Sequence, residues 1–270
     1  MCALAGVSRS GYYKWLLCKQ GRQETLNQKL CELIGIFYKN SKGVLGYRQM
    51  ALKLNRETKF RVNEKRVLRL MRILGLKSVC RRSKRTWKPS DWQVIAENRL
   101  NREFHAQTFG QKWLTDITEM KYGTGKKAYL SAILDLSDKS IVAFKLGHSN
   151  NNELVFETFD AAHLSYPDMT PLFHSDRGYQ YTSKSFKKKL DEAGMTQSMS
   201  RVGKCIDNGP MESFWGTLKT EMYYLERFES YEDLRKAVEE YIIYYNTKRY
   251  QKRLKGMTPM EYREHLKEVS

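Results

Sequence analysis

The sequence predicts an α/β fold, in which a basic, all-helical N-terminal region precedes a mixed β-sheet with helices on its faces. Of the 270 residues, 1–112 carry 25 Lys and Arg against 7 Asp and Glu, and so hold the whole net charge of +18, whereas 113–270 carry 23 of each sign. The hydrophobic pattern also changes from a helical period to strand-like runs at Trp113. We therefore expect four parts: a helical region at 1–77, a basic linker at 78–112, a sheet-containing core at 113–225, and a helical extension with a basic tail at 226–270.

Apolar stripes predict the N-terminal helices. Residues 1–16 are typical of the second half of a helix-turn-helix, with Gly6 at the turn and Ser8 as the N-cap. Residues 26–37 and the stretch GVLGYRQMALKLN give two further helices. Asn63 caps the next helix, whose expected apolar face is Val67, Leu70, Met71 and Leu74.

The positive charge indicates binding to a polyanion, and nucleic acid is the partner we expect. Basic residues of the helix after Asn63 lie largely opposite its apolar face, which suits a helix lying against DNA; a merely solvated face is the alternative. Trp87 and Trp92 in the linker either stack on bases or pack on a neighbouring domain. The expected DNA-binding residues in these two parts are Lys65, Arg66, Arg69, Arg72, Arg81, Arg82, Lys84 and Arg85.

Several classes of protein are disfavoured by the composition. The five cysteines are scattered without a C-x-x-C pair, so neither a structural zinc site nor a disulfide framework is indicated. No secretory signal is visible, and no apolar run approaches the ~20 residues that span a bilayer. We expect a cytoplasmic protein, nucleoid-associated when bound to DNA, with no membrane partner.

The core region reads as a succession of strands and helices. Three runs, WLTDITEMKY, KAYLSAILDLS and SIVAFKLG, predict an antiparallel meander. After them come a helix capped by Asn151, the short strand PLFHSD, a helix ending at Gly194, the strand TQSMS and a helix beginning at Pro210. This order predicts a mixed sheet.

Three carboxylates occupy unusual places in this succession. Asp116 lies inside the first strand, Asp176 ends the fourth, and Glu212 is in the first turn of the helix after the fifth. If the first and fourth strands are neighbours, the aspartates meet at one sheet edge, and three converging carboxylates repel one another unless a cation is bound. Mg²⁺ prefers oxygen ligands, and two such ions serve phosphoryl transfer. The alternative is that Glu212 only caps its helix or favours its positive end.

The motifs around these carboxylates resemble the integrase core of DDE transposases. They are WLTDIT, HSDRG followed by Tyr179 and Tyr181, and DNGPMESFWGTLKTE, and the 35 residues between Asp176 and Glu212 match the usual spacing of that class. The stretches GVSRSGYYKW, GYRQM and YNTKRYQKRLKGMTPMEY resemble the second reading-frame product of bacterial insertion sequences that make transposase by frameshifting.

This resemblance implies a ribonuclease-H-like catalytic core with Asp116, Asp176 and Glu212 as its catalytic, metal-binding triad. It implies two Mg²⁺ ions, with Mn²⁺ as a substitute, and it implies cleavage at element ends followed by transfer of the 3′-hydroxyl to target DNA. The implied partners are DNA of both kinds, a homo-oligomer on DNA, and an upstream-frame fusion or partner protein. His174, Arg177 and Lys219 are further candidates for contact with DNA, Lys219 because it lies seven residues after Glu212 on the same helix. The alternatives are a structural role for His174 and Arg177 and a solvated side chain for Lys219.

Two other readings stay open from the sequence. One is a catalytically silent, transposase-derived DNA-binding regulator, for which a broken triad would be typical. The other is a different integrase or nuclease of the same fold. The absent His-His-Cys-Cys spacing disfavours a retroviral-type integrase, and the basic helical region disfavours a bare nuclease.

Overall fold

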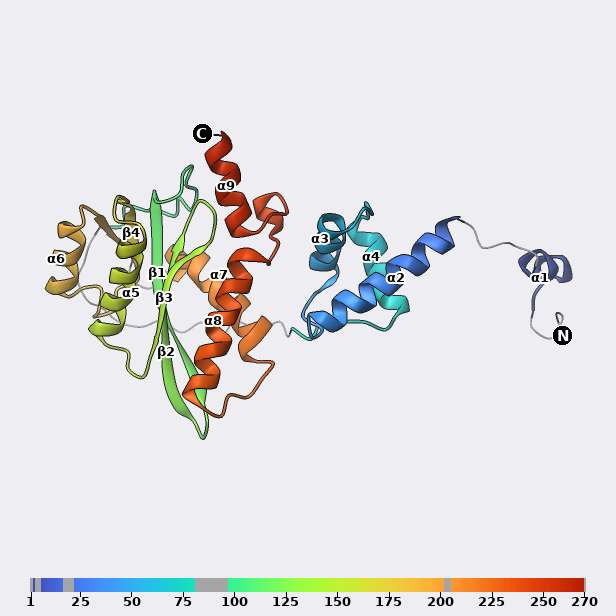
Figure 1. The fold of residues 1–270 in the computed structure, drawn as a ribbon, viewed down its shortest axis with the longest axis horizontal. Helices are drawn as coiled ribbons and strands as arrows, with labels where there is room; N and C mark the ends of the chain where they lie inside the picture. The colour runs from blue at the N-terminus through green and yellow to red at the C-terminus, as the bar shows by residue number, and fades with distance from the viewer. Residues whose placement is uncertain (1, 3–5, 17–21, 81–96, 202–204, 270) are drawn as a thin grey trace. The chain divides into compact units, whose positions relative to one another are not determined.

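The chain divides into two compact units, Met1–Val79 and Cys80–Ser270. The structure is a computed structural model that describes all residues except 1, 3–5, 17–21, 81–96, 202–204 and 270 (Figure 1). Each unit is described by itself below.

The first unit is helical, as predicted. It contains α1 (Arg9–Leu16), α2 (Arg22–Asn40), α3 (Tyr47–Glu57) and α4 (Glu64–Ile73). Gly6 has a positive φ and Ser8 accepts from the amide of Gly11, in agreement with the expected turn and cap. The last three helices close around one apolar core, whose members include Leu30, Ile34, Met50, Leu54, Val67, Leu70 and Met71.

Helix α4 confirms the predicted cap and corrects one core position. The side chain of Asn63 accepts from the amide of Arg66 at 2.8 Å. Leu74, which the helical period placed on the apolar face, is 39% exposed. It lies outside the core because the helix ends at Ile73 and the chain turns at Gly75, where φ is +68°.

The second unit is built on a five-stranded mixed sheet with the order β3-β2-β1-β4-β5. Its strands are β1 (Lys112–Tyr122), β2 (Lys126–Asp135), β3 (Ile141–Gly147), β4 (Leu172–Ser175) and β5 (Thr196–Met199). The first three pair antiparallel, and β4 joins β1 in parallel, as the succession of elements predicted. β5 continues the parallel half.

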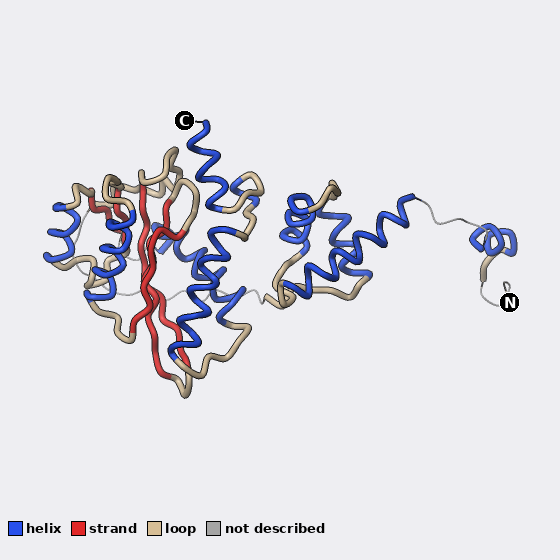
Figure 2. The backbone as a smooth tube through the Cα atoms, in the orientation of Figure 1, coloured by secondary structure: helices blue, strands red, loops and turns tan. Residues whose placement is uncertain are grey.

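Helices cover both faces of this sheet (Figures 1 and 2). One apolar cluster joins a sheet face to α5 (Asn152–Ser165) and α6 (Lys184–Glu192). The other joins the opposite face to α7 (Gly209–Leu218) and α8 (Tyr231–Thr247). A π-helical turn, Lys219–Tyr223, extends α7, and α8 begins with a capping box of Ser230 and Asp233.

A buried ion pair anchors the last helix, α9 (Pro259–Val269), to the sheet. The Nε of Arg263 lies 2.6 Å from Oδ2 of Asp138, in the turn between β2 and β3, and both side chains are almost fully buried. The same guanidinium donates to Ser140 and Tyr166 and lies 3.6 Å from the ring centroid of Phe109. The C-terminal end is therefore part of the same compact unit as the sheet.

We predict that Arg263→Ala lowers the free energy of unfolding by about 3–5 kcal/mol, because it leaves the Asp138 carboxylate buried without its partner. Urea unfolding followed by circular dichroism measures the change. The matched control is Arg235→Ala, which breaks exposed ion pairs with Glu232 and Glu239 and should leave the unfolding midpoint almost unchanged. Equal losses for both variants would contradict an anchoring role.

Candidate active site

The alternation of side chains along β1 decides which way Asp116 faces. Leu114 and Met120 pack in the cluster formed with α7 and α8, whereas Trp113 packs on the side of α5 and α6. Because successive side chains of a strand point to opposite faces, Asp116 shares the face of Leu114 and Met120 and points toward α7. Thr115 points the other way, and its hydroxyl lies 3.1 Å from the buried hydroxyl of Tyr181.

The register of the parallel strands brings Asp176 level with Asp116. Lys112 is paired with Leu172 and Leu114 with His174. If the same register continues for two more residues, Asp176 lies beside Asp116. Asp176 is then at the carboxyl end of β4, which is where binding sites are commonly found in parallel sheets.

The backbone at Gly178 lies close to the Asp176 carboxylate and fixes its position. The amide of Gly178 donates to Oδ1 of Asp176 at 2.9 Å. A Cβ at position 178 would lie 3.0 Å from that oxygen and 2.8 Å from Oε1 of Gln180, so a larger residue would disturb this hydrogen bond.

One face of α7 is turned toward β1. The side-chain amide of Asn208, just before the helix, donates to the carbonyl of Thr115 at 3.1 Å, and Nε1 of Trp215 donates to Oδ2 of Asp116 at 3.0 Å. Glu212 lies four residues after Asn208 and three before Trp215, so it shares their face. Lys219 continues the same stripe. No side-chain cap is formed at the start of α7, so the reading of Glu212 as half of a capping box is wrong.

The electrostatics agree with this arrangement. Burial raises the pKa of Asp116 to about 7, and the charges of Asp176 and Glu212 add to the rise, although the Ile117 amide and Trp215 act against it. Burial also raises the pKa of Asp176. Burial lowers the pKa of Lys219, against the attraction of Glu119 and Asp116, so its ammonium lies within electrostatic reach of Asp116.

The donors present suit a hard cation. Asp116, Asp176 and Glu212 offer oxygen atoms only, and none of the three makes an ion pair with a residue that the structure describes. Within those residues, His, Cys, Asp and Glu side chains are nowhere gathered in threes into a ready metal-binding group. The residue types and their shared face fit Mg²⁺, and their use as ligands belongs to the proposal below.

His174 takes the structural one of its two predicted roles. Its side chain is fully buried, and its two ring nitrogens lie 2.9 and 3.2 Å from the hydroxyls of Ser198 and Ser200. Burial lowers its pKa to about 4, so the ring is neutral. Arg177 donates through Nε to the carbonyl of Ser200 at 2.6 Å.

The predicted DNA-binding residues of the first unit separate into two kinds. Lys65, Arg69 and Arg72 are exposed on α4. Arg66 instead bonds back to α2, with donors 2.8–3.1 Å from the side-chain oxygens of Gln23 and Asn27. The linker residues Arg81, Arg82, Lys84, Arg85, Trp87 and Trp92 lie outside the described residues.

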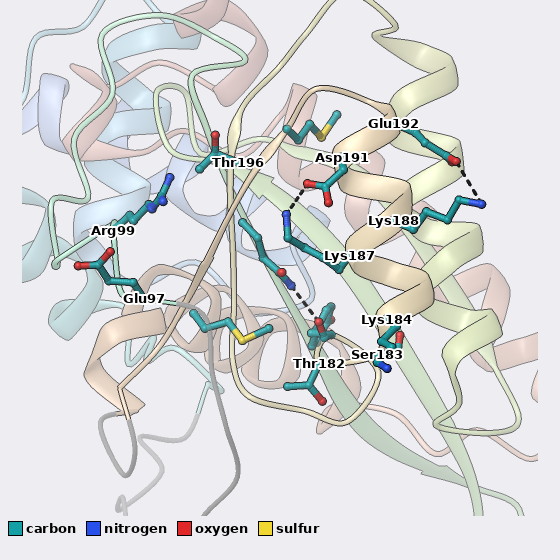
Figure 3. Close-up of a pocket in the computed structure, with 14 residues that line it drawn as sticks. Glu97, Arg99, Thr182, Ser183, Lys184, Lys187, Lys188, Asp191, Glu192 and Thr196 are labelled. Carbon is teal, nitrogen blue, oxygen red and sulfur yellow. Dashed lines mark hydrogen bonds and ion pairs between the residues drawn. The ribbon is translucent and has the colours of Figure 1, made fainter.

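A pocket of about 990 Å³ lies at the edge formed by α6 and β5, apart from the three carboxylates. Its wall on α6 carries the ion pairs of Lys187 with Asp191 and Lys188 with Glu192 (Figure 3). None of the three carboxylates lines this pocket, so it is not part of the candidate site.

Comparison with known proteins now places the chain. Integrase core domains match residues 107–205 and 212–266, and an HTH-like domain matches residues 25–84. InsK of Escherichia coli, named as a transposase for insertion sequence element IS150, is 38% identical over 262 residues, which are 96% of this chain and 90% of InsK. The chain belongs to the insertion-sequence transposases with an integrase core. A transposase-like protein of Haemophilus influenzae is 45% identical over 79% of this chain and 98% of its own length.

The fold agrees with this family. A chain of the simian T-cell lymphotropic virus intasome superposes with a TM-score of 0.53 at 16% identity, covering 85% of this chain and 74% of that chain. The second unit is thus a ribonuclease-H-like core of the integrase type. In the part of the chain that the structure describes, no helix is long and apolar enough to cross a bilayer.

Sequence reasoning missed two residues of this site. Trp215 is not among the predicted site residues, although its indole donates to Asp116. It passed over Asp207, whose buried carboxylate receives two arginines. The three-residue spacing from Glu212 was a signal for Trp215; nothing local distinguished Asp207.

We predict that His174→Ala lowers the free energy of unfolding by about 1–3 kcal/mol, because the buried hydroxyls of Ser198 and Ser200 lose their partner. DNA affinity and its salt dependence should not change in the folded fraction. Thermal melting and fluorescence anisotropy at several salt concentrations measure the two effects. A weaker affinity with an unchanged melting temperature would restore the phosphate contact.

Proposed function

We propose that this transposase cuts DNA at the ends of its element and joins the freed 3′-hydroxyl to target DNA, with Asp116, Asp176 and Glu212 as the metal-binding catalytic triad. The observation that carries the proposal is that Asp176 directly follows the strand paired with that of Asp116, while the charges of Asp176 and Glu212 both raise the pKa of Asp116. The membership in the family and the matched integrase core domains support it.

Residues of the chain orient the two aspartate carboxylates and supply a positive charge beside them. Asp116 is oriented by the indole of Trp215, and Asp176 by the Gly178 amide, so each keeps oxygen free to face the other. When bound there, Mg²⁺, or Mn²⁺ in its place, supplies activation of the attacking oxygen and stabilisation of the leaving one. The ammonium of Lys219 lies on the same stripe of α7, where it suits a phosphate of the DNA end.

The partner of this chemistry is DNA, which the charge of the first unit supports. The exposed Lys65, Arg69 and Arg72 form a basic face on α4 opposite its buried residues Val67 and Leu70. Such a face binds phosphates and positions the duplex. We also propose that the protein acts as a homo-oligomer on DNA, and that an upstream-frame product joins it as a fusion or a partner.

A silent DNA-binding regulator is the competing function. It shares the basic helices, so DNA binding does not separate the two. A broken triad would be typical of such a regulator, and the presence of Asp116, Asp176 and Glu212 in the sequence therefore favours the enzyme.

We predict that Glu212→Gln abolishes cleavage and joining with Mg²⁺ while the unfolding free energy without metal changes by less than about 1 kcal/mol. Gln keeps the size of the side chain but loses the charge that binds the cation. A strand-joining assay on labelled element ends, together with thermal melting, measures both properties.

The matched control is Glu221→Gln on the π-helical turn after α7. Glu221 is paired with Arg249 at 2.7 Å and accepts from Tyr241, so its loss should lower the melting temperature and leave joining in the folded fraction intact. Glu212→Gln with joining preserved would remove Glu212 from the triad.

For DNA binding, we predict that Lys65→Ala and Arg69→Ala each weaken the affinity of the full chain. Each should reduce the slope of log K against log salt concentration by about 1, because one phosphate contact is lost. Arg66→Ala should lower the melting temperature instead, since it breaks the bonds to Gln23 and Asn27. Fluorescence anisotropy with duplex DNA tests this, and an unchanged slope for the first two variants would contradict a contact by α4.

A further inference from the structure

A buried carboxylate outside the triad lies at the entrance to α7. Asp207 is the third residue of a 3₁₀ turn, Cys205–Asn208, that leads directly into the helix, and its side chain is fully buried. Five donors surround it. They are Nδ2 of Asn98 at 2.9 Å, Nε of Arg102 at 2.7 Å, and the amide, Nε and Nη2 of Arg201 at 3.0, 3.0 and 3.1 Å.

These contacts tie together segments that are distant in the sequence. Asn98 and Arg102 precede β1, Arg201 follows β5, and Asp207 precedes α7. Burial opposes the charge of Asp207, but the hydrogen bonds from Arg201 and Arg102 outweigh it and hold its pKa far below the usual value. The carboxylate is therefore a permanent, fully satisfied anchor.

The anchor acts where α7 has no side-chain cap, in addition to the apolar packing of Met211. Asn208, at the N-cap position, instead turns its amide across the site to the carbonyl of Thr115. Pro210 has no amide hydrogen to contribute. The first turn of α7, which carries Glu212, is thus held from outside the helix, by Asp207 on one side and by β1 on the other.

We propose that Asp207 is the positioning residue for Glu212: the arginine-bound carboxylate fixes the first turn of α7 so that Glu212 faces Asp116. Asp207 itself touches neither Asp116 nor the reacting DNA in this role. The inference rests on the proposed function in one respect, that Glu212 binds the metal.

The test uses the full chain with Asp207→Asn, which keeps the shape of the side chain but removes the charge that holds Arg102 and Arg201. Hydrogen exchange without metal should become faster in the first two turns of α7. The Mg²⁺ concentration for half-maximal effect should rise about tenfold or more, as is typical when a residue that orients a ligand is changed. Joining and isothermal titration calorimetry with Mg²⁺ both report that concentration.

A second variant covers a failure of Asp207→Asn to fold. Arg102→Gln removes one of the two guanidinium groups, and 41% of the arginine side chain is exposed, so the fold should survive. It should show the same two changes to a smaller degree. The control is Asp138→Asn, equally buried and paired with Arg263, which should lower the melting temperature without either change.

The outcomes separate this proposal from the proposed function. Unchanged exchange in α7, or an unchanged Mg²⁺ midpoint by calorimetry in both variants, would overturn the positioning role. The same changes in Asp138→Asn would also overturn it, because they would then reflect a general loss of stability. A wild-type chain that binds Mg²⁺ but joins no DNA would overturn the proposed function alone.

Discussion

The contact between α7 and β1 is the interaction on which the rest of the site depends. An α-helix turns by about 100° per residue, so a slip of one residue would carry Glu212 away from the strand. Met211, Phe214 and Leu218 are buried in the core and fix the rotation of α7. The polar stripe that faces Asp116 follows from this packing, because the helix cannot bury its apolar residues without turning Glu212 toward the sheet.

The contact between α7 and β1 holds the Asp116 carboxylate in an environment that lowers the stability of the fold. A carboxylate inside a central strand loses water, and here it also meets two like charges, so the pKa of Asp116 rises to about 7. The neighbouring positions of β1 are filled by apolar or hydroxyl side chains that pack without conflict, such as Leu114 and Thr115. A fold that keeps one unfavourable charge among otherwise consistent positions does so at a functional site.

A feature could be predicted from the sequence when the residues that form it are close together in the chain. The strands, their order and the face of Asp116 follow from alternation and spacing, which are local patterns. The placement of Asp207 against Arg102 and of Arg263 against Asp138 depends on residues 105 and 125 positions apart, and no local pattern records such a pairing. The partners of His174 and Arg66 could not be predicted for the same reason, since they lie 24 and 39 positions away in the sequence.

The buried carboxylates of this unit fall into two kinds, and the difference between them bears on the site. Asp138, Asp207 and Glu221 each have an arginine within 3 Å. Asp116 and Asp176 accept only from an indole and from backbone amides, and no described residue forms an ion pair with either. An arginine offsets the cost of the charge in those three cases. Asp135, which is also buried, is instead satisfied by the Trp113 indole, the Gly110 amide and Ser137. Asp116 and Asp176 differ from Asp135 in lying beside Glu212, and the divalent cation proposed above would neutralise the charge that these three carboxylates share.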